Sequence, residues 1–163
     1  MEVALRTALA GIADAVGESG HGVETEHDRW ALYERAIRSS VGLDLLREAV
    51  ALEEDRALAV TVVLRMLEQA PESEHAAWIG LLPVDNRSFS ERRAAEIRIL
   101  RRAKEDVLPA TEIASTLGEW TDWLQLRLAE LLVDRDGLEA LSIDGRTRRI
   151  RNVASTRLRS LAA

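Results

Sequence analysis

The sequence predicts an all-α fold, and three observations support this. Apolar residues recur every three or four positions through most of the chain, which places them on one side of an α-helix. Residues that favour strands are scarce, since the chain has one tyrosine, one phenylalanine and no alternating run of β-branched residues. Residues that typically start or end helices separate the periodic segments at short intervals.

The first 40 residues are expected to form a pair of helices. Gly17 follows the first periodic segment and can end that helix in the left-handed conformation that glycine tolerates. Thr25 and Asp28 then have the spacing of a capping box, in which each side chain accepts a hydrogen bond from the other residue's backbone N–H. A second helix that carries Trp30 is expected after them.

The middle of the chain contains its most apolar segment, residues 55–69, which predicts a central, buried helix. Ser88 and Glu91 again have capping-box spacing, so the next long helix is expected to start near Ser90. His75 falls in the first turn of a short helix and is expected on the surface. The other helices are expected near residues 43–52, 73–82, 110–118, 121–132, 135–141 and 147–161.

These ten helices fall into five pairs. The second helices read alike, with an acidic or hydroxyl residue followed by arginine and alanine among branched apolar residues, as in DRALAVTVVL, SERRAAEIRIL and TRRIRNVASTRL. They start near Asp28, Asp55, Ser90, Thr121 and Thr147, and a recurrence of roughly 20–50 residues is typical of stacked helical arrays.

Over about residues 41–161 this pattern resembles HEAT-type repeats, whose helix pairs stack into a curved solenoid. The proline that this family has in its first helix, and the Asp and Arg around its second helix, are approached by Pro83, Pro109 and the pair Asp55–Arg56. The resemblance implies a HEAT-like α-solenoid of about five helix pairs. An irregular multi-helix bundle is the alternative fold.

A single helical-repeat domain is expected over residues 1–163, with an atypical helix pair at 1–40 and repeat-like pairs at 41–163. No segment approaches the ~20 apolar residues of a membrane span, and the N-terminus lacks the apolar block of a signal peptide. We therefore expect a cytoplasmic protein. Lys104 is the single lysine beside many arginines, which is typical of a bacterial genome rich in G and C.

The composition excludes several kinds of chemistry. Without cysteine there can be no disulfide, thiolate zinc site or cysteine nucleophile. The sequence also lacks a glycine-rich phosphate loop and a serine nucleophile elbow. The metal-capable side chains cluster at His21, Glu24, Glu26, His27 and Asp28, but acids there are better explained as favourable charges at a helix N-terminus. We expect no metal, no cofactor and no catalytic residue.

Charge is divided unevenly along the chain, whose net charge is −6. Residues 1–86 hold seven Arg and sixteen Asp or Glu, a balance of −9, whereas residues 87–163 hold fifteen Lys or Arg and twelve acids, a balance of +3. The basic residues gather in segments 87–104 and 146–159. In a HEAT-like array both would be second helices, which commonly line the concave surface.

The candidate binding residues come from these two basic segments and from the tryptophan pair between them. They are Arg98, Arg102, Trp120, Trp123, Arg148, Arg151 and Arg159. Tryptophan and arginine dominate the energetics of protein interfaces. The structural alternatives are core packing for the tryptophans, and solvation or pairing with neighbouring acids for the arginines.

The leading hypothesis is a non-enzymatic protein-binding module, such as an adaptor, an immunity-type or a regulatory protein, that uses a curved surface. It would bind an acidic partner through the arginines or a basic partner through the N-terminal half. Nucleic-acid binding by the C-terminal half is the first alternative. A HEAT-like DNA base-excision glycosylase is the second, because those enzymes are similar in carrying Trp, Asp and Arg in a cleft; the nearest equivalents here are Trp120, Asp122, Trp123 and Arg127. No membrane partner is expected, and the oligomeric state stays open.

Overall fold

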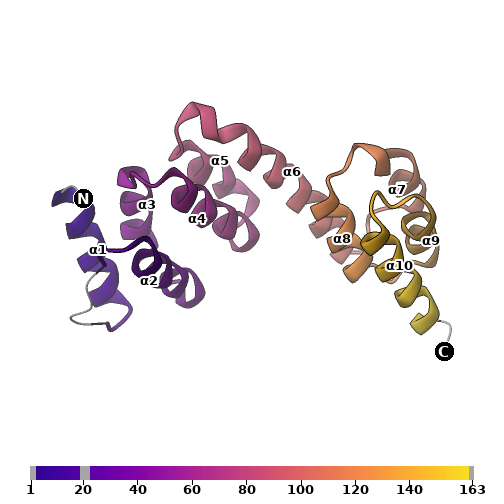
Figure 1. The fold of residues 1–163 in the computed structure, drawn as a ribbon, viewed down its shortest axis with the longest axis horizontal. Helices are drawn as coiled ribbons and strands as arrows, with labels where there is room; N and C mark the ends of the chain where they lie inside the picture. Colours follow the sequence, from indigo (N-terminus) through magenta and orange to yellow (C-terminus); the bar gives the residue numbers. More distant parts are fainter. Residues whose placement is uncertain (1–2, 19–22, 162–163) are drawn as a thin grey trace. The chain divides into compact units, whose positions relative to one another are not determined.

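The computed structural model describes residues 3–18 and 23–161, and over these residues it contains helices and no strands (Figure 1). The predicted all-α fold with ten helices is confirmed. Within the described residues, no helix is both long enough and apolar enough to span a membrane. The finer predictions, a solenoid and one repeat domain over the whole chain, stay predictions.

The ten α-helices alternate with short connections, two of which are 3₁₀ helices at Val84–Asn86 and Leu117–Glu119. The helices are α1 Val3–Ala15, α2 Glu26–Ser39, α3 Leu43–Leu52, α4 Arg56–Gln69, α5 Glu72–Gly80, α6 Arg87–Lys104, α7 Ala110–Thr116, α8 Asp122–Leu131, α9 Arg135–Asp144 and α10 Arg148–Leu161. Their contacts divide the chain into two compact units, residues 1–94 and 95–163, called here the N-terminal and the C-terminal unit.

Local sequence signals set the ends of several helices. After α1, Gly17 has a φ of +76°, and the N–H of Glu18 reaches back to the carbonyl of Ala13 at 2.8 Å, which closes the helix end. The predicted capping box at α2 is confirmed, because Thr25 Oγ1 accepts from the N–H of Asp28 and the Asp28 carboxylate accepts from the N–H of Thr25. Helix α8 starts beside Thr121, the predicted position, and Thr121 Oγ1 caps it by accepting from the N–H of Leu124.

Two expectations were wrong, both because of contacts that local spacing does not show. Helix α6 begins at Arg87, ahead of Ser90, since the Arg87 guanidinium donates to the carbonyls of Leu82 at 2.8 Å and Gly80 at 2.9 Å and so occupies the end of α5. His75 is buried, since α5 packs on α4 and the His75 ring nitrogen lies 3.3 Å from the carbonyl oxygen of Ala70.

In the N-terminal unit, α1 packs on α3, and α2 packs on α4, which also contacts α3 and α5. Helix α4 is central, as predicted, but it keeps one exposed side. Its fully or nearly buried side chains are Leu58, Ala59, Val62, Val63, Met66 and Leu67. Thr61, Arg65 and Glu68 are exposed. Burial of these apolar side chains against the neighbouring helices stabilises the unit.

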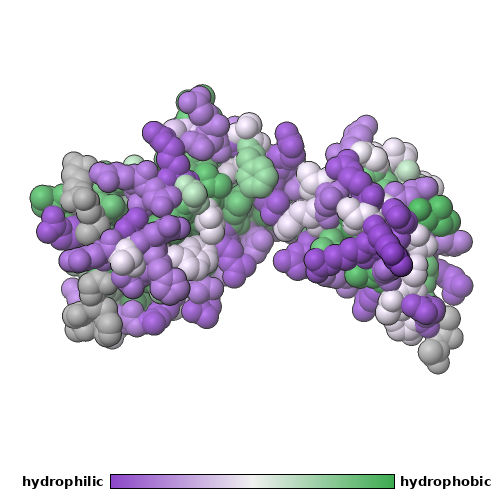
Figure 2. Space-filling model, viewed as in Figure 1, coloured by the Kyte–Doolittle hydropathy of each residue, from purple (hydrophilic) through white to green (hydrophobic). Residues whose placement is uncertain are grey.

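In the C-terminal unit, α7 packs on α9, and α10 packs on both α8 and α9. The shared core includes Leu124, Leu128, Leu138, Leu141 and Ile150. Gln125 is buried among them, and its amide donates to the carbonyls of Leu117 and Trp120 while accepting from the N–H of Arg146. These bonds satisfy a buried amide that would otherwise be costly. Hydrophilic side chains cover much of the surface of each unit in the view of Figure 2.

Candidate functional site

Arg102, one of the predicted binding residues, is held by the protein's own framework. Its NH1 and NH2 donate to the two carboxylate oxygens of Glu112 at 2.7 and 2.6 Å, and this two-point contact ties the end of α6 to α7. The Glu112 hydrogen bond raises the pKa of Arg102, and the same bond lowers the pKa of Glu112. The charge of Arg102 is therefore balanced by the carboxylate of Glu112.

The two tryptophans of the C-terminal unit contact its core. Trp120 is 7% exposed and belongs to the core, and Trp123 is partly buried against it. Asp122 lies 3.6 Å from Arg146, and Arg127 pairs with Glu130 at 3.2 Å. The four residues that resemble a glycosylase cleft thus include one buried ring and two charged groups with partners nearby.

The remaining predicted arginines differ in what they contact. Arg151 is partly buried and donates to the carbonyl of Gly145, while Arg159 donates to Ser155 and Thr156 of its own helix. Arg98 and Arg148 are exposed on α6 and α10. Arg151 and Arg159 therefore form hydrogen bonds within the chain, and a binding role for the predicted arginines stays a prediction.

The N-terminal unit contains a groove that the sequence analysis did not anticipate. It has a volume of about 390 Å³ and lies between the first turns of α2 and α4. Its lining residues are Glu26, His27 and Trp30 from α2, and Ala57, Leu58 and Thr61 from α4. Each α2 lining residue is separated from one α4 lining residue by the same number of positions, which matches the spacing between the helices that the repeat hypothesis treats as second helices.

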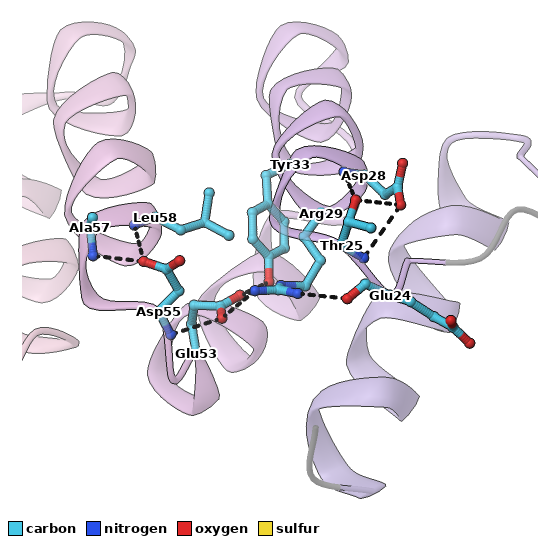
Figure 3. Close-up of polar contacts among 9 residues, drawn as sticks. All are labelled: Glu24, Thr25, Asp28, Arg29, Tyr33, Glu53, Asp55, Ala57 and Leu58. Atoms are coloured by element: carbon cyan, nitrogen blue, oxygen red, sulfur yellow. Dashed lines mark hydrogen bonds and ion pairs between the residues drawn. The ribbon is translucent and has the colours of Figure 1, made fainter.

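A buried polar network beside the groove fixes α2 against the turn between α3 and α4 (Figure 3). The carboxylate of Glu53, whose side chain is 1% exposed, accepts from Arg29 Nε at 3.0 Å and Arg29 NH2 at 3.2 Å. It also accepts from the hydroxyl of Tyr33 at 2.9 Å and from the N–H of Asp55 at 3.1 Å. Asp55 in turn caps α4 by accepting from the N–H groups of Ala57 and Leu58. The network therefore positions both walls of the groove.

The same network determines the ionisation of its members. Burial raises the pKa of Tyr33 well above its ordinary value, and the negative charge of Glu53 raises it further. Burial alone would lower the pKa of Arg29, but the hydrogen bond and the charge of Glu53 outweigh burial and the net pKa is raised. Both groups are protonated at neutral pH at their ordinary pKa values, and the raised pKa values extend their protonated forms to more alkaline pH.

The groove suits an apolar or cationic group better than an anion. Helix N-termini attract anions through free backbone N–H groups, but here Thr25 and Asp55 already accept from the first-turn N–H groups. Glu26 adds a negative charge to the lining, which includes no lysine or arginine. Trp30 supplies an aromatic ring that is partly exposed.

Metal binding by the acidic start of α2 gains no support from its geometry. Asp28 is engaged by Thr25, whose hydroxyl donates to it at 2.6 Å and lowers its pKa. Among the described residues, no three His, Cys, Asp or Glu side chains are placed to share a metal ion. His21, a member of the sequence cluster, lies outside the described residues.

Comparisons with known proteins add no relative to this picture. No family model matches the chain, and nothing similar to it is found among curated proteins or solved structures. The resemblance to HEAT-type repeats therefore stays a prediction.

Proposed function

We propose that this chain is a non-enzymatic protein-binding module whose N-terminal unit holds a segment of a partner protein in the groove between α2 and α4. The groove itself carries the proposal, since it combines the ring of Trp30, the apolar side chains of Ala57 and Leu58, and the carboxylate of Glu26. Tryptophan is a preferred anchor of protein interfaces. The volume of the groove is within the range of ordinary binding pockets, roughly 300–1,000 Å³.

The order of helix packing supports a surface of this kind. In the N-terminal unit the two first helices, α1 and α3, pack together, as do the two second helices, α2 and α4. The C-terminal unit repeats the order with α7 on α9 and α8 on α10. Stacked helix pairs would have this order, and such arrays bind partners along the face where equivalent helices lie side by side.

Nucleic-acid binding by the C-terminal unit is less well supported. Phosphate contacts need several accessible cations on one face, whereas Arg102 is neutralised by Glu112 and Arg151 is turned to the Gly145 carbonyl. Base excision needs an accessible aromatic pocket, and Trp120 is buried in the core. Titration of a labelled DNA duplex at ~50 mM salt tests both, because a phosphate-binding surface gains affinity at low salt.

Selection of short random peptides on the full-length chain tests the proposed function. Peptides enriched by the wild-type protein should bind each of two groove variants at least about tenfold more weakly. This factor corresponds to ~1.4 kcal/mol. Trp30→Leu removes the aromatic ring, and Thr61→Arg fills the groove from α4. Thr111→Arg, the same change at an exposed helical position of the C-terminal unit, is the matched control. Peptides that bind all four proteins equally would contradict the proposal.

A further inference from the structure

The pentapeptide Glu-His-x-x-Trp occurs twice in the N-terminal unit, in α2 and in α5. In α2 it runs from Glu26 to Trp30 as EHDRW, and in α5 it runs from Glu74 to Trp78 as EHAAW. Positions four apart on a helix lie one above the other on the same side. Each copy therefore offers a carboxylate and an indole ring to one incoming side chain.

The α5 copy shows what this arrangement holds. The guanidinium of Arg47, from α3, pairs with the carboxylate of Glu74 at 2.5 Å. The same guanidinium lies over the ring of Trp78, with its carbon 4.8 Å from the ring centroid. A planar guanidinium can stack on an indole and still direct its N–H groups to a carboxylate. With Arg47 in place and its other neighbours packed, Trp78 is fully buried.

The α2 copy has the same spacing but a different environment. Glu26 and Trp30 both line the groove, and Trp30 stays partly exposed. Among the described residues, no guanidinium lies over Trp30 and no cation pairs with Glu26. Arg29, which lies inside this pentapeptide, is turned to Glu53 and is not available to it.

We infer that the α2 copy is a receptor for an arginine side chain of the partner protein, stacked on Trp30 and paired with Glu26. This inference rests on the proposed function, because that proposal places the partner in the groove. The local charge agrees with it, since the lining carries Glu26 and neither lysine nor arginine. The N-terminal unit as a whole holds seventeen acids and ten arginines, which favours approach of a basic segment.

Arginine fits this receptor better than lysine does. Its flat guanidinium can cover the indole and reach the carboxylate with two donors, whereas the ammonium of lysine is a compact and strongly hydrated charge. Replacing arginine by citrulline keeps the shape and removes the charge. It therefore removes the ion pair and the cation–π attraction together while leaving the rest of a peptide unchanged.

The experiment uses the peptides selected by the full-length chain, resynthesised with each arginine changed in turn to citrulline or to lysine. Each peptide should contain one arginine whose change to citrulline lowers the affinity at least about tenfold, which corresponds to ~1.4 kcal/mol. Changing the same arginine to lysine should lower the affinity by a smaller factor. Glu26→Gln should lower the affinity for the peptide that carries this arginine by a similar factor. It should leave the affinity for the peptide with citrulline at that position unchanged, which indicates direct coupling between the two groups. Glu48→Gln, the same charge change at an exposed position of α3, should leave both affinities unchanged.

The outcomes separate this inference from the proposed function. Peptides that need Trp30 but tolerate citrulline at every position would overturn the arginine receptor and leave the groove as a binding site. Selected peptides that do not need Trp30 would overturn both. Self-association of the purified chain that Glu26→Gln abolishes would make a second copy the occupant, and would overturn the assignment to a partner protein.

Discussion

Replacing Glu53 by alanine should destabilise this protein more than replacing any exposed acidic residue by alanine. The Glu53 carboxylate accepts four hydrogen bonds, two from Arg29, one from Tyr33 and one from the N–H of Asp55 (Figure 3). Glu53→Ala would leave the Arg29 guanidinium, whose side chain is 12% exposed, without its carboxylate. It would also leave the buried Tyr33 hydroxyl without an acceptor.

The size of the effect follows from these contacts. Removing one partner of a buried ion pair typically costs 3–5 kcal/mol, because the other charge stays buried. Arg29 keeps some exposure and still donates to the carbonyl of Glu24 at 3.4 Å, so we expect the lower end, about 3 kcal/mol. Changing both Glu53 and Arg29 to methionine should cost much less, since no unpaired charge is then left.

Urea unfolding followed by far-ultraviolet circular dichroism measures this difference as a change in midpoint at constant slope. Glu54→Ala, at the exposed neighbouring position, is the matched control and should lie within ~0.5 kcal/mol of wild type. A loss below ~1 kcal/mol for Glu53→Ala, or a double variant as unstable as the single one, would refute the view that this carboxylate neutralises a buried charge.

Three further experiments address Tyr33, Gly145 and Ser90. Tyr33 is the chain's single tyrosine, and burial and the charge of Glu53 raise its pKa. Phenolate absorbance should therefore be absent from the folded protein near pH 10. The free energy of unfolding should fall as the pH rises above ~10, because the tyrosine of the unfolded chain ionises there first. Gly145→Ala should cost ~1–3 kcal/mol in urea unfolding, because a Cβ would lie 2.4 Å from a carbonyl oxygen. Gly118→Ala, with open space, should stay within ~0.5 kcal/mol. Ser90→Ala should leave stability unchanged or raise it by up to ~1 kcal/mol, because its buried hydroxyl has no hydrogen-bond partner among the described residues.

Helix boundaries could be predicted from sequence where a local signal determines them. The capping box of Thr25 and Asp28, and the left-handed Gly17, involve residues within one turn of each other, so spacing alone is informative. The start of α6 could not be predicted in this way. It coincides with the contacts of Arg87 to carbonyls at the end of α5, whereas the capping-box spacing of Ser88 and Glu91 points to a later start and both residues lie inside α6.

The candidate site was harder to predict because composition reports charges and not their partners. Arg102 and Glu112 are ten residues apart, and their pairing depends on the turn between α6 and α7. A count of basic residues treats Arg102 as available to bind an anion, although the carboxylate of Glu112 already balances its charge. The groove was missed for the converse reason, because Trp30 and Thr61 belong to different helices and only the packing of α2 on α4 brings them together.

The two Glu-His-x-x-Trp pentapeptides show this limit most directly. Both form helix and both place a carboxylate one turn from an indole, so their local sequences predict the same thing. Their environments differ because α3 supplies Arg47 to the copy in α5, whereas the copy in α2 faces a groove. In α5 the carboxylate and the indole hold an arginine of the same chain, and it is tertiary packing that supplies this arginine to one copy and not to the other. Since Arg47 already provides an internal example of the contact, the arginine receptor proposed at Trp30 requires no interaction that this fold does not already form.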